Sequence, residues 1–340
     1  MIKNLLRKIL IPAILLLSVI HLRCDLAIDD YDPYIPPEYE TGMWFVGQVN
    51  TGGDAVFVKG VKISGLQYAL VADGANGLQI VNITNPESPA IVYNYKTFGY
   101  VKEVYPDTIN GSTYAFISDN INGLYVLNIS NPGAPVLDTL ISFSGGVTSA
   151  VSKNRKLYAS FAGTAFKIFD LNNLPGEVQE LSNYSPVNSV KRIEVVGNIA
   201  YLVESVTKIE IVDVANPASP FKYSTFSTPG ACYDIKVADG LMYVADGNAG
   251  VTVINVSNPA QPFYMSSTNT YTSVKAVDHS PNFFFTAEGN AGTEVFNLFN
   301  PVYPEAFGYY EPGGECKSIQ YFKGKVLVAH GTNGLLILRF

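Results

Sequence analysis

Through most of the chain, apolar residues alternate with polar ones or run in short blocks. The blocks are rich in Val, Ile, Tyr and Phe and are five or six residues long, as at 67–72 and 78–83. This pattern is typical of β-strands. Glycine-containing turns such as Asp73-Gly-Ala-Asn-Gly77 separate the blocks, and no 3.6-residue helical periodicity competes with them. The sequence therefore predicts an all-β protein.

The strand pattern repeats seven times with a period of about 42 residues. The residues that end the second strand of each unit are spaced by 46, 42, 43, 42, 42 and 42 residues. They are Asp73, Asp119, Phe161, Glu204, Asp246, Glu288 and His330. Each unit has room for four strands: an inner one such as 55–59, a second, a third ending before an Asn-Pro turn, and an outer one such as 90–95. Units of this length with four strands predict propeller blades.

The two ends of the chain predict how the ring closes. The seventh unit ends with its third strand at Phe340, and residues 43–49 precede the first inner strand. The segment Gly52-Gly-Asp-Ala55 aligns with Gly313-Gly-Glu-Cys316, which follows an outer strand, so 43–49 is expected to be an outer strand. Its pairing with 334–339 would leave no free edge at the closure. We therefore predict an all-β, seven-bladed β-propeller over 43–340, with four-stranded antiparallel blades and an N-terminal strand completing the last one.

Four segments resemble the LVIVD-repeat family. They are LQIVNITNP at 78–86, LYVLNISNP at 124–132, IEIVDVANP at 209–217 and VTVINVSNP at 251–259. The resemblance extends over about residues 43–340. It implies a secreted or cell-envelope propeller and names no common activity, because a fold does not by itself determine a function.

The first 23 residues predict an export signal. They contain Lys3, Arg7, Lys8 and Arg23 and no acidic residue, and residues 9–20 form an apolar run too short to span a bilayer comfortably. Cys24 resembles the lipidated first residue of a bacterial lipoprotein, although His21 and Arg23 depart from the usual motif. Lipidation of Cys24 predicts a protein anchored at the outer membrane or the periplasmic face of the cell envelope. Cleavage to a secreted form and an uncleaved anchor are the alternatives.

Residues 24–42 predict an extended tether between anchor and propeller. This segment has Pro33, Pro36 and Pro37, no basic residue and six acids, which are Asp25, Asp29, Asp30, Asp32, Glu38 and Glu40. Like charges and prolines favour an extended chain. Without its first 23 residues the chain has 18 basic and 29 acidic residues, a net charge of −11. Such a surface repels phosphate backbones, so nucleic acid is excluded as a partner.

The residues that end the second strand of each unit align in a column, and five of them are acids. This acidic column is the candidate binding site. Because alternate antiparallel strands run in the same direction, Asp73, Asp119, Glu204, Asp246, Glu288 and His330 should lie on one face of the ring. Two interpretations follow. Each acid caps its own turn, or the group binds a cation or a basic ligand at the channel mouth.

Other catalytic and metal-binding patterns are missing from the sequence. After export, His279 and His330 are the histidines left, no Cys-x-x-Cys or His-Glu-x-x-His occurs, and Trp44 is the one tryptophan. The sialidase-like and quinoprotein classes of propeller enzyme, which need an arginine cluster or repeated tryptophans, are therefore disfavoured. Cys232 and Cys316 are two repeats apart, too far for a disulfide, and we expect both to pack in the core. The sequence predicts no cofactor, no metal site and no catalytic residue.

Two functions remain from the sequence. The first is a non-catalytic cell-envelope binding or scaffold module that presents a propeller face to a protein or polysaccharide. Aromatic loops such as Phe98-Gly-Tyr100 and Tyr309-Tyr310 favour it. The alternative is a hydrolase or lyase that uses carboxylates at the channel mouth, which requires two acids with separated pKa values.

Overall fold

The computed structural model describes residues 42–204 and 207–340. The predicted signal peptide, Cys24 and the tether up to residue 41 lie outside the described residues. Within them, 28 strands form seven four-stranded sheets in which sequence neighbours pair antiparallel. None of the described residues forms a helix with the length and apolar character needed to cross a membrane.

Each blade is given from its inner to its outer strand. The first has β2 (Phe57–Ile63), β3 (Leu66–Ala72), β4 (Leu78–Asn82) and β5 (Ala90–Tyr95). The second has β6 (Val101–Ile109), β7 (Ser112–Asp119), β8 (Gly123–Asn128) and β9 (Val136–Ser142). The third has β10 (Val147–Lys153), β11 (Lys156–Phe161), β12 (Ala165–Asp170) and β13 (Gln179–Tyr184). The fourth has β14 (Arg192–Val196), β15 (Ile199–Val203), β16 (Lys208–Asp213) and β17 (Phe221–Ser227).

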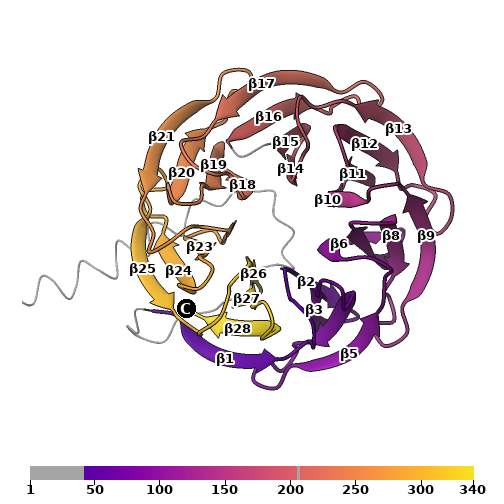
Figure 1. Cartoon of the computed structure of the whole chain (residues 1–340), viewed down its shortest axis with the longest axis horizontal. Helices are drawn as coiled ribbons and strands as arrows, with labels where there is room; N and C mark the ends of the chain where they lie inside the picture. The colour runs from indigo at the N-terminus through magenta and orange to yellow at the C-terminus, as the bar shows by residue number, and fades with distance from the viewer. Residues whose placement is uncertain (1–41, 205–206) are drawn as a thin grey trace, which may run out of the picture. The chain divides into compact units, whose positions relative to one another are not determined.

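The remaining blades follow the same order. The fifth has β18 (Asp234–Ala238), β19 (Leu241–Ala245), β20 (Val251–Asn255) and β21 (Phe263–Thr268). The sixth has β22 (Ala276–His279), β23 (Phe283–Ala287), β24 (Thr293–Asn297) and β25 (Glu305–Tyr310). The seventh has β26 (Ser318–Phe322), β27 (Lys325–Ala329), β28 (Leu335–Arg339) and, from the other end of the chain, β1 (Trp44–Val49). Figure 1 shows the blades in a ring, with their first strands toward the centre and their fourth strands on the circumference.

The predicted ring closure is confirmed. Strand β1 pairs antiparallel with β28, from Trp44 opposite Arg339 to Val49 opposite Leu335. The predicted seven-bladed β-propeller and its 43–340 core are therefore correct in strand number and order. The first inner strand runs over Phe57–Ile63 instead of the expected 55–59. The difference arises because Ala55 pairs with Gly331 of the seventh blade in an isolated bridge, before its own sheet begins.

Every outer strand has a bulge at the same place. The register between third and fourth strands shifts once in each of the seven described sheets, for example between Ile80 and Val81 and between Phe45 and Gly47. Bulges twist an exposed edge and discourage pairing with another chain. The same bulge in β1 indicates that this strand has the geometry of an ordinary outer strand.

The core lies between the blades. The buried apolar residues of the described chain fall into seven clusters, each of which joins two adjacent blades. Fully buried aromatic rings such as Phe116 and Phe284 each contribute about 1.5–3 kcal/mol through burial. Cys232 and Cys316 lie in two of these clusters as free thiols, as predicted, and burial raises the pKa of Cys316 to about 12.

Candidate functional site

The five predicted column acids are buried, and their side chains bond to the linkers. The linkers are the segments that join the outer strand of one blade to the inner strand of the next. Asp73 accepts hydrogen bonds from Thr51 Oγ1 at 2.6 Å and from Asn76 Nδ2 at 2.8 Å. Burial raises the pKa of Asp73, and these hydrogen bonds partly offset the effect. Asp119 accepts from the backbone N–H groups of Gly99 at 2.9 Å and Ile121 at 2.8 Å. The side chains therefore hold the linker and the turn together.

The same bond recurs in the later blades. In three of them, the linker residue four positions before the first residue of the inner strand donates its backbone N–H to the column carboxylate. The pairs are Asn188 with Glu204 at 3.3 Å, Gly230 with Asp246 at 3.0 Å and Thr272 with Glu288 at 3.1 Å. Backbone and carboxylate approach closely here, since a Cβ added at Gly99 would lie 2.2 Å from Asp119 Oδ1. These contacts confirm that the turns after the second strand and the linkers share one face of the ring, which we call the linker face.

His330 takes the column position in the seventh blade. Its ring is buried beside the linker segment that contains Gly313. Burial lowers the pKa of His330. Within the described residues, no group of three or more His, Cys, Asp or Glu side chains is placed to hold a metal ion. A ligand-binding role for the column stays a prediction, and its geometry favours the capping interpretation.

Two blades carry a second acid beside the column residue. Six positions after the column, Gln79 donates to Asp73 at 3.3 Å and Thr252 donates to Asp246 at 2.8 Å. Glutamates occupy this position in the fourth and sixth blades as Glu210 and Glu294. Burial raises the pKa of Glu294 to about 8, and the charge of Glu288 and a hydrogen bond with it act in the same direction. The raised pKa favours the protonated form of Glu294 beside the carboxylate of Glu288.

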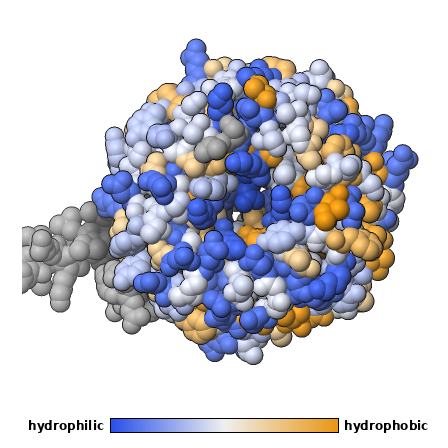
Figure 2. Space-filling view, in the orientation of Figure 1, coloured by the Kyte–Doolittle hydropathy of each residue, from blue (hydrophilic) through white to orange (hydrophobic). Residues whose placement is uncertain are grey.

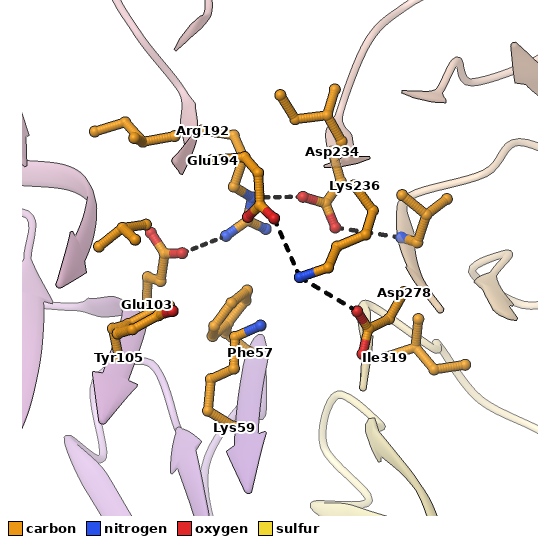
Figure 3. A pocket seen from close by; sticks show the side chains of 14 residues that line it. Phe57, Lys59, Glu103, Tyr105, Arg192, Glu194, Asp234, Lys236, Asp278 and Ile319 are labelled. Carbon is orange, nitrogen blue, oxygen red and sulfur yellow. Dashed lines mark hydrogen bonds and ion pairs between the residues drawn. The ribbon is translucent and has the colours of Figure 1, made fainter. Parts of the chain in front are cut away.

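The centre of the ring holds a group of charged side chains that the sequence reasoning missed. They are Lys59, Glu103, Arg192, Glu194, Asp234, Lys236 and Asp278, and we call them the channel cluster. The cavity that they line also touches Val151 and Ile319, so all seven inner strands contribute to it. Figure 3 shows these side chains pointing toward one another, and Figure 2 shows hydrophilic surface around the central opening. The cavity has a volume of about 20 Å³, enough for about one ordered water.

The channel cluster is an ion-pair network. Arg192 lies between Glu103, 2.7 Å from Nη1, and Asp234, 2.9 Å from Nε. Lys236 lies between Glu194 at 3.2 Å and Asp278 at 3.6 Å. Burial raises the pKa of Glu103 and of Asp234, and the charge of Arg192 opposes that effect.

The same carboxylates also bond to the inner strands of neighbouring blades. Asp234 Oδ2 accepts from Val277 N at 3.2 Å, and Asp278 Oδ2 accepts from Tyr321 N at 2.8 Å. Glu103 Oε2 accepts from Ala150 N at 3.2 Å. The inner edge of a blade presents backbone N–H groups that no fifth strand covers, and these side chains satisfy them. The channel cluster therefore joins the blades around the axis.

One signal for the channel cluster was present in the sequence. When the repeats are aligned, one inner-strand position contains Glu103, Arg192 and Asp234, and the position two residues later contains Lys59, Glu194, Lys236 and Asp278. Polar residues recurring at an inner-strand position that should be half-buried indicate a paired network. The column residues are conspicuous in the sequence because they are nearly all acids, whereas the channel positions alternate in sign.

The linker face also displays apolar side chains. Phe98, Val187 and Tyr271 are 88%, 63% and 66% exposed, and each lies directly before the linker residue that the column carboxylate binds. We call these three the tip residues. Tyr309, 57% exposed, contacts Tyr271 with ring centroids 5.5 Å apart. Tyr100, named with Phe98 from the sequence, is instead half-buried and donates to Asp54 at 2.8 Å.

Comparison with known proteins identifies the repeat. The family model described as the LVIVD repeat matches residues 52–97, 110–140, 188–228 and 229–270. No curated protein matches the chain. Among solved structures, the chain is similar to a computationally designed protein, Ika8, with a TM-score of 0.64 and 10% identity over 88% of this chain and 100% of that one. At that identity the likeness concerns the fold alone.

Proposed function

We propose, starting from a closed propeller built of LVIVD repeats, that this protein is a non-catalytic binding or scaffold module of the cell envelope. The linker face is its contact surface for a protein or polysaccharide partner. The repeat fold is consistent with such a module. Exposed aromatic side chains on a rigid support are typical of binding surfaces, because little conformational entropy is lost when they are covered.

The observation that carries the proposal is the link between the tip residues and the column. Phe98 precedes Gly99, whose N–H is bound by Asp119, and Tyr271 precedes Thr272, whose N–H is bound by Glu288. Val187 precedes Asn188, which donates to Glu204 through its backbone and, at 2.9 Å, through its side chain. The buried acids thus hold the backbone from which the exposed tips project.

The carboxylate geometry gives less support to a hydrolase or lyase. Glu294 has the raised pKa that a general acid uses and lies beside Glu288, but Glu288 and Glu294 are only 2% and 5% exposed. Glu288 also accepts from Thr272 N at 3.1 Å and from Thr286 Oγ1 at 2.7 Å. A substrate would have to displace both donors to reach this pair.

Photo-crosslinking tests the contact surface. Benzoylphenylalanine is placed singly at positions 98, 187 and 271 and, as a control, at Phe299, which is 93% exposed on an Asn-Pro loop at the other end of its blade. After irradiation with envelope membranes, the tip positions should crosslink to the same partner and position 299 should not. Equal crosslinking at position 299, or none at the tips, would contradict the proposal.

The envelope address is proposed from the N-terminal sequence. A basic segment, an apolar run and Cys24 together favour a lipid anchor, and several acyl chains on one residue give stable membrane attachment. Cys24→Ser should move the protein from the membrane to the soluble fraction, and mass spectrometry of the wild-type N-terminus should find an acylated cysteine. An unmodified Cys24 in a secreted chain, or unchanged membrane association of the variant, would contradict this address.

A further inference from the structure

Three of the linkers share a second sequence pattern, which involves a lysine. Lysine follows each tip residue at a distance of four positions, in FGYVK at 98–102, VNSVK at 187–191 and YTSVK at 271–275. The three motifs enter the second, fourth and sixth blades. In the linkers that enter the other blades, the position equivalent to the tip residue is occupied by Gly52, Ser144, Pro229 and Gly313. Large apolar tips therefore alternate around the ring with small ones.

The three lysines are available for a partner. Lys102 and Lys191 are exposed, and neither forms an ion pair with any described residue. Lys275 is half-buried, with its Nζ 4.2 Å from the centre of the Tyr233 ring, which leaves its charge without a carboxylate among those residues. Each tip residue thus has a cation beside it in sequence.

The seventh blade provides an internal contrast. Lys317 occupies the same inner-strand position, but it pairs with Asp54 at 2.7 Å and with Glu315 at 3.3 Å. Its linker carries Gly313 in place of an apolar tip. A lysine without a large tip is therefore neutralised within the protein, whereas the three lysines with large tips are left uncompensated.

We propose that the three motifs form a docking site for an acidic segment of a partner protein. This inference rests on the proposed function and specifies the chemistry of its partner. Residues 42–340 have 18 basic and 23 acidic residues, so three lysines without a carboxylate partner are an exception on a propeller with a net negative charge. Complementary charge attracts and orients a partner, and covered apolar tips add affinity. A protein segment fits better than a polysaccharide because Val187, one of the three tips, has no ring on which a sugar could stack.

The test uses the full-length chain in a non-ionic detergent and a displayed library of random twelve-residue peptides. We expect the enriched peptides to carry a net negative charge together with apolar residues. For such a peptide, the triple variant Lys102→Gln/Lys191→Gln/Lys275→Gln should weaken binding about tenfold, because it removes three ion pairs that are at least partly exposed to solvent. Phe98→Ser/Val187→Ser/Tyr271→Ser should weaken it at least as much, and raising NaCl from 50 to 300 mM should weaken wild-type binding.

Two control variants test whether a loss of peptide binding is specific to the three lysines of the motifs. Lys317→Gln removes a lysine from the same strand position whose charge is already paired. Lys62→Gln removes an exposed lysine at the other end of the first inner strand. Both should bind the selected peptide within twofold of wild type. The exposed substitutions Lys62→Gln, Lys102→Gln and Lys191→Gln should each melt within about 2 °C of wild type, because exposed substitutions change stability little.

The outcomes separate this inference from the proposed function. Neutral or basic peptides whose binding needs the tips and not the lysines would overturn the acidic partner and leave the linker face as a binding surface. Alginate binding with the same lysine dependence, and no peptide enriched, would overturn a protein partner in favour of an anionic polysaccharide. Enriched peptides that depend on neither set of residues, or no binding of peptides or alginate, would overturn both proposals.

Discussion

Buried charges occur in two regions of this ring, the column and the channel, and the two are satisfied in different ways. The column acids accept hydrogen bonds mainly from neutral donors within one blade and its linker, as Asp119 does from Gly99 and Ile121. The channel acids pair with cations from other blades, as Glu103 does with Arg192 across 89 residues of sequence. The column therefore stabilises each linker through local hydrogen bonds, whereas the channel cluster joins different blades through ion pairs.

The difference predicts unequal costs of mutation. A buried charge that loses its ionic partner is left uncompensated, whereas a carboxylate that is removed leaves only neutral N–H groups without an acceptor. The following predictions run from the largest expected effect to the smallest.

Arg192→Met should be the most damaging substitution. It leaves Glu103 and Asp234, 2.7 and 2.9 Å from the guanidinium, without their common cation. Breaking a buried pair in this way costs about 3–5 kcal/mol, measured as the free energy of unfolding in urea. The triple variant Arg192→Met/Glu103→Gln/Asp234→Asn should recover more than half of the loss. A loss below about 1 kcal/mol would mean that water solvates these acids and that the channel is not a joining network.

Asp119→Ala should cost less and act locally. Three backbone N–H groups, those of Gly99, Ile121 and Asn122, lose their acceptor. We expect a loss of about 2 kcal/mol, and about 1 kcal/mol for Asp119→Asn, which keeps one acceptor oxygen. The measurement is urea unfolding of the two variants beside wild type. If the Ala variant lost as much as Arg192→Met, the contrast between local and shared charges would be wrong.

Glu294→Gln should stabilise the protein, and only at high pH. The pKa of Glu294 is about 8 in the folded protein, against an ordinary value of 4.5 for a glutamate, so the folded state holds the proton more tightly than the unfolded chain does. Its contribution to stability is present below about pH 4.5 and is lost as the pH rises through 8. The variant should therefore melt about 2 °C higher than wild type at pH 9 and equally at pH 4.

The reciprocal substitution is the control for that result. Gln79→Glu places a second acid beside Asp73, six positions after the column as in the sixth blade. It should lower the melting temperature at pH 9 more than at pH 5. A pH-independent change in both variants would indicate altered packing in place of a shared proton.

Glu180→Gln should have the smallest effect. Lys167 on β12 and Glu180 on the outer strand β13 form an ion pair of 2.7 Å, but the Glu180 side chain is 41% exposed. Exposed pairs of this kind contribute about 0–1 kcal/mol, so we expect a change below about 0.5 kcal/mol in urea unfolding, with partial loss in high salt. A loss of unfolding free energy near that of Asp119→Ala would show that the distance between the charged atoms, and not their burial, sets the contribution of an ion pair to stability.

The sequence predicted the parts of the structure that depend on short-range pattern. The period near 42 residues, the outer strand at 43–49 and its pairing with the last third strand follow from alternation and spacing, and β1 and β28 confirm them. The turn glycines were also foreseen, since Gly74 and Gly247 have φ angles of 60° and 59° beside their column acids. At these positions the structure is determined by interactions between residues that are close in sequence or regularly spaced, so the sequence alone predicts it.

The channel cluster was not predicted from the sequence because it depends on contacts between repeats. Glu103 reaches Arg192 past the third blade, where the equivalent inner-strand positions hold the small residues Ser149 and Val151. One-dimensional spacing does not reveal which blades face one another across the axis. The column gave the opposite difficulty. Its acids were found from the sequence, but their orientation toward the linkers required the structure.

Amide hydrogen exchange of the linkers tests the central claim most directly, namely that the column acids hold the linkers that carry the tip residues. The N–H groups of Gly99, Asn188, Gly230 and Thr272 should be protected in the wild-type protein. Asp119→Ala should remove the protection at Gly99 and leave it at Asn188, Gly230 and Thr272. Unprotected amides in wild type, or a loss of protection at all four positions in the variant, would contradict the account.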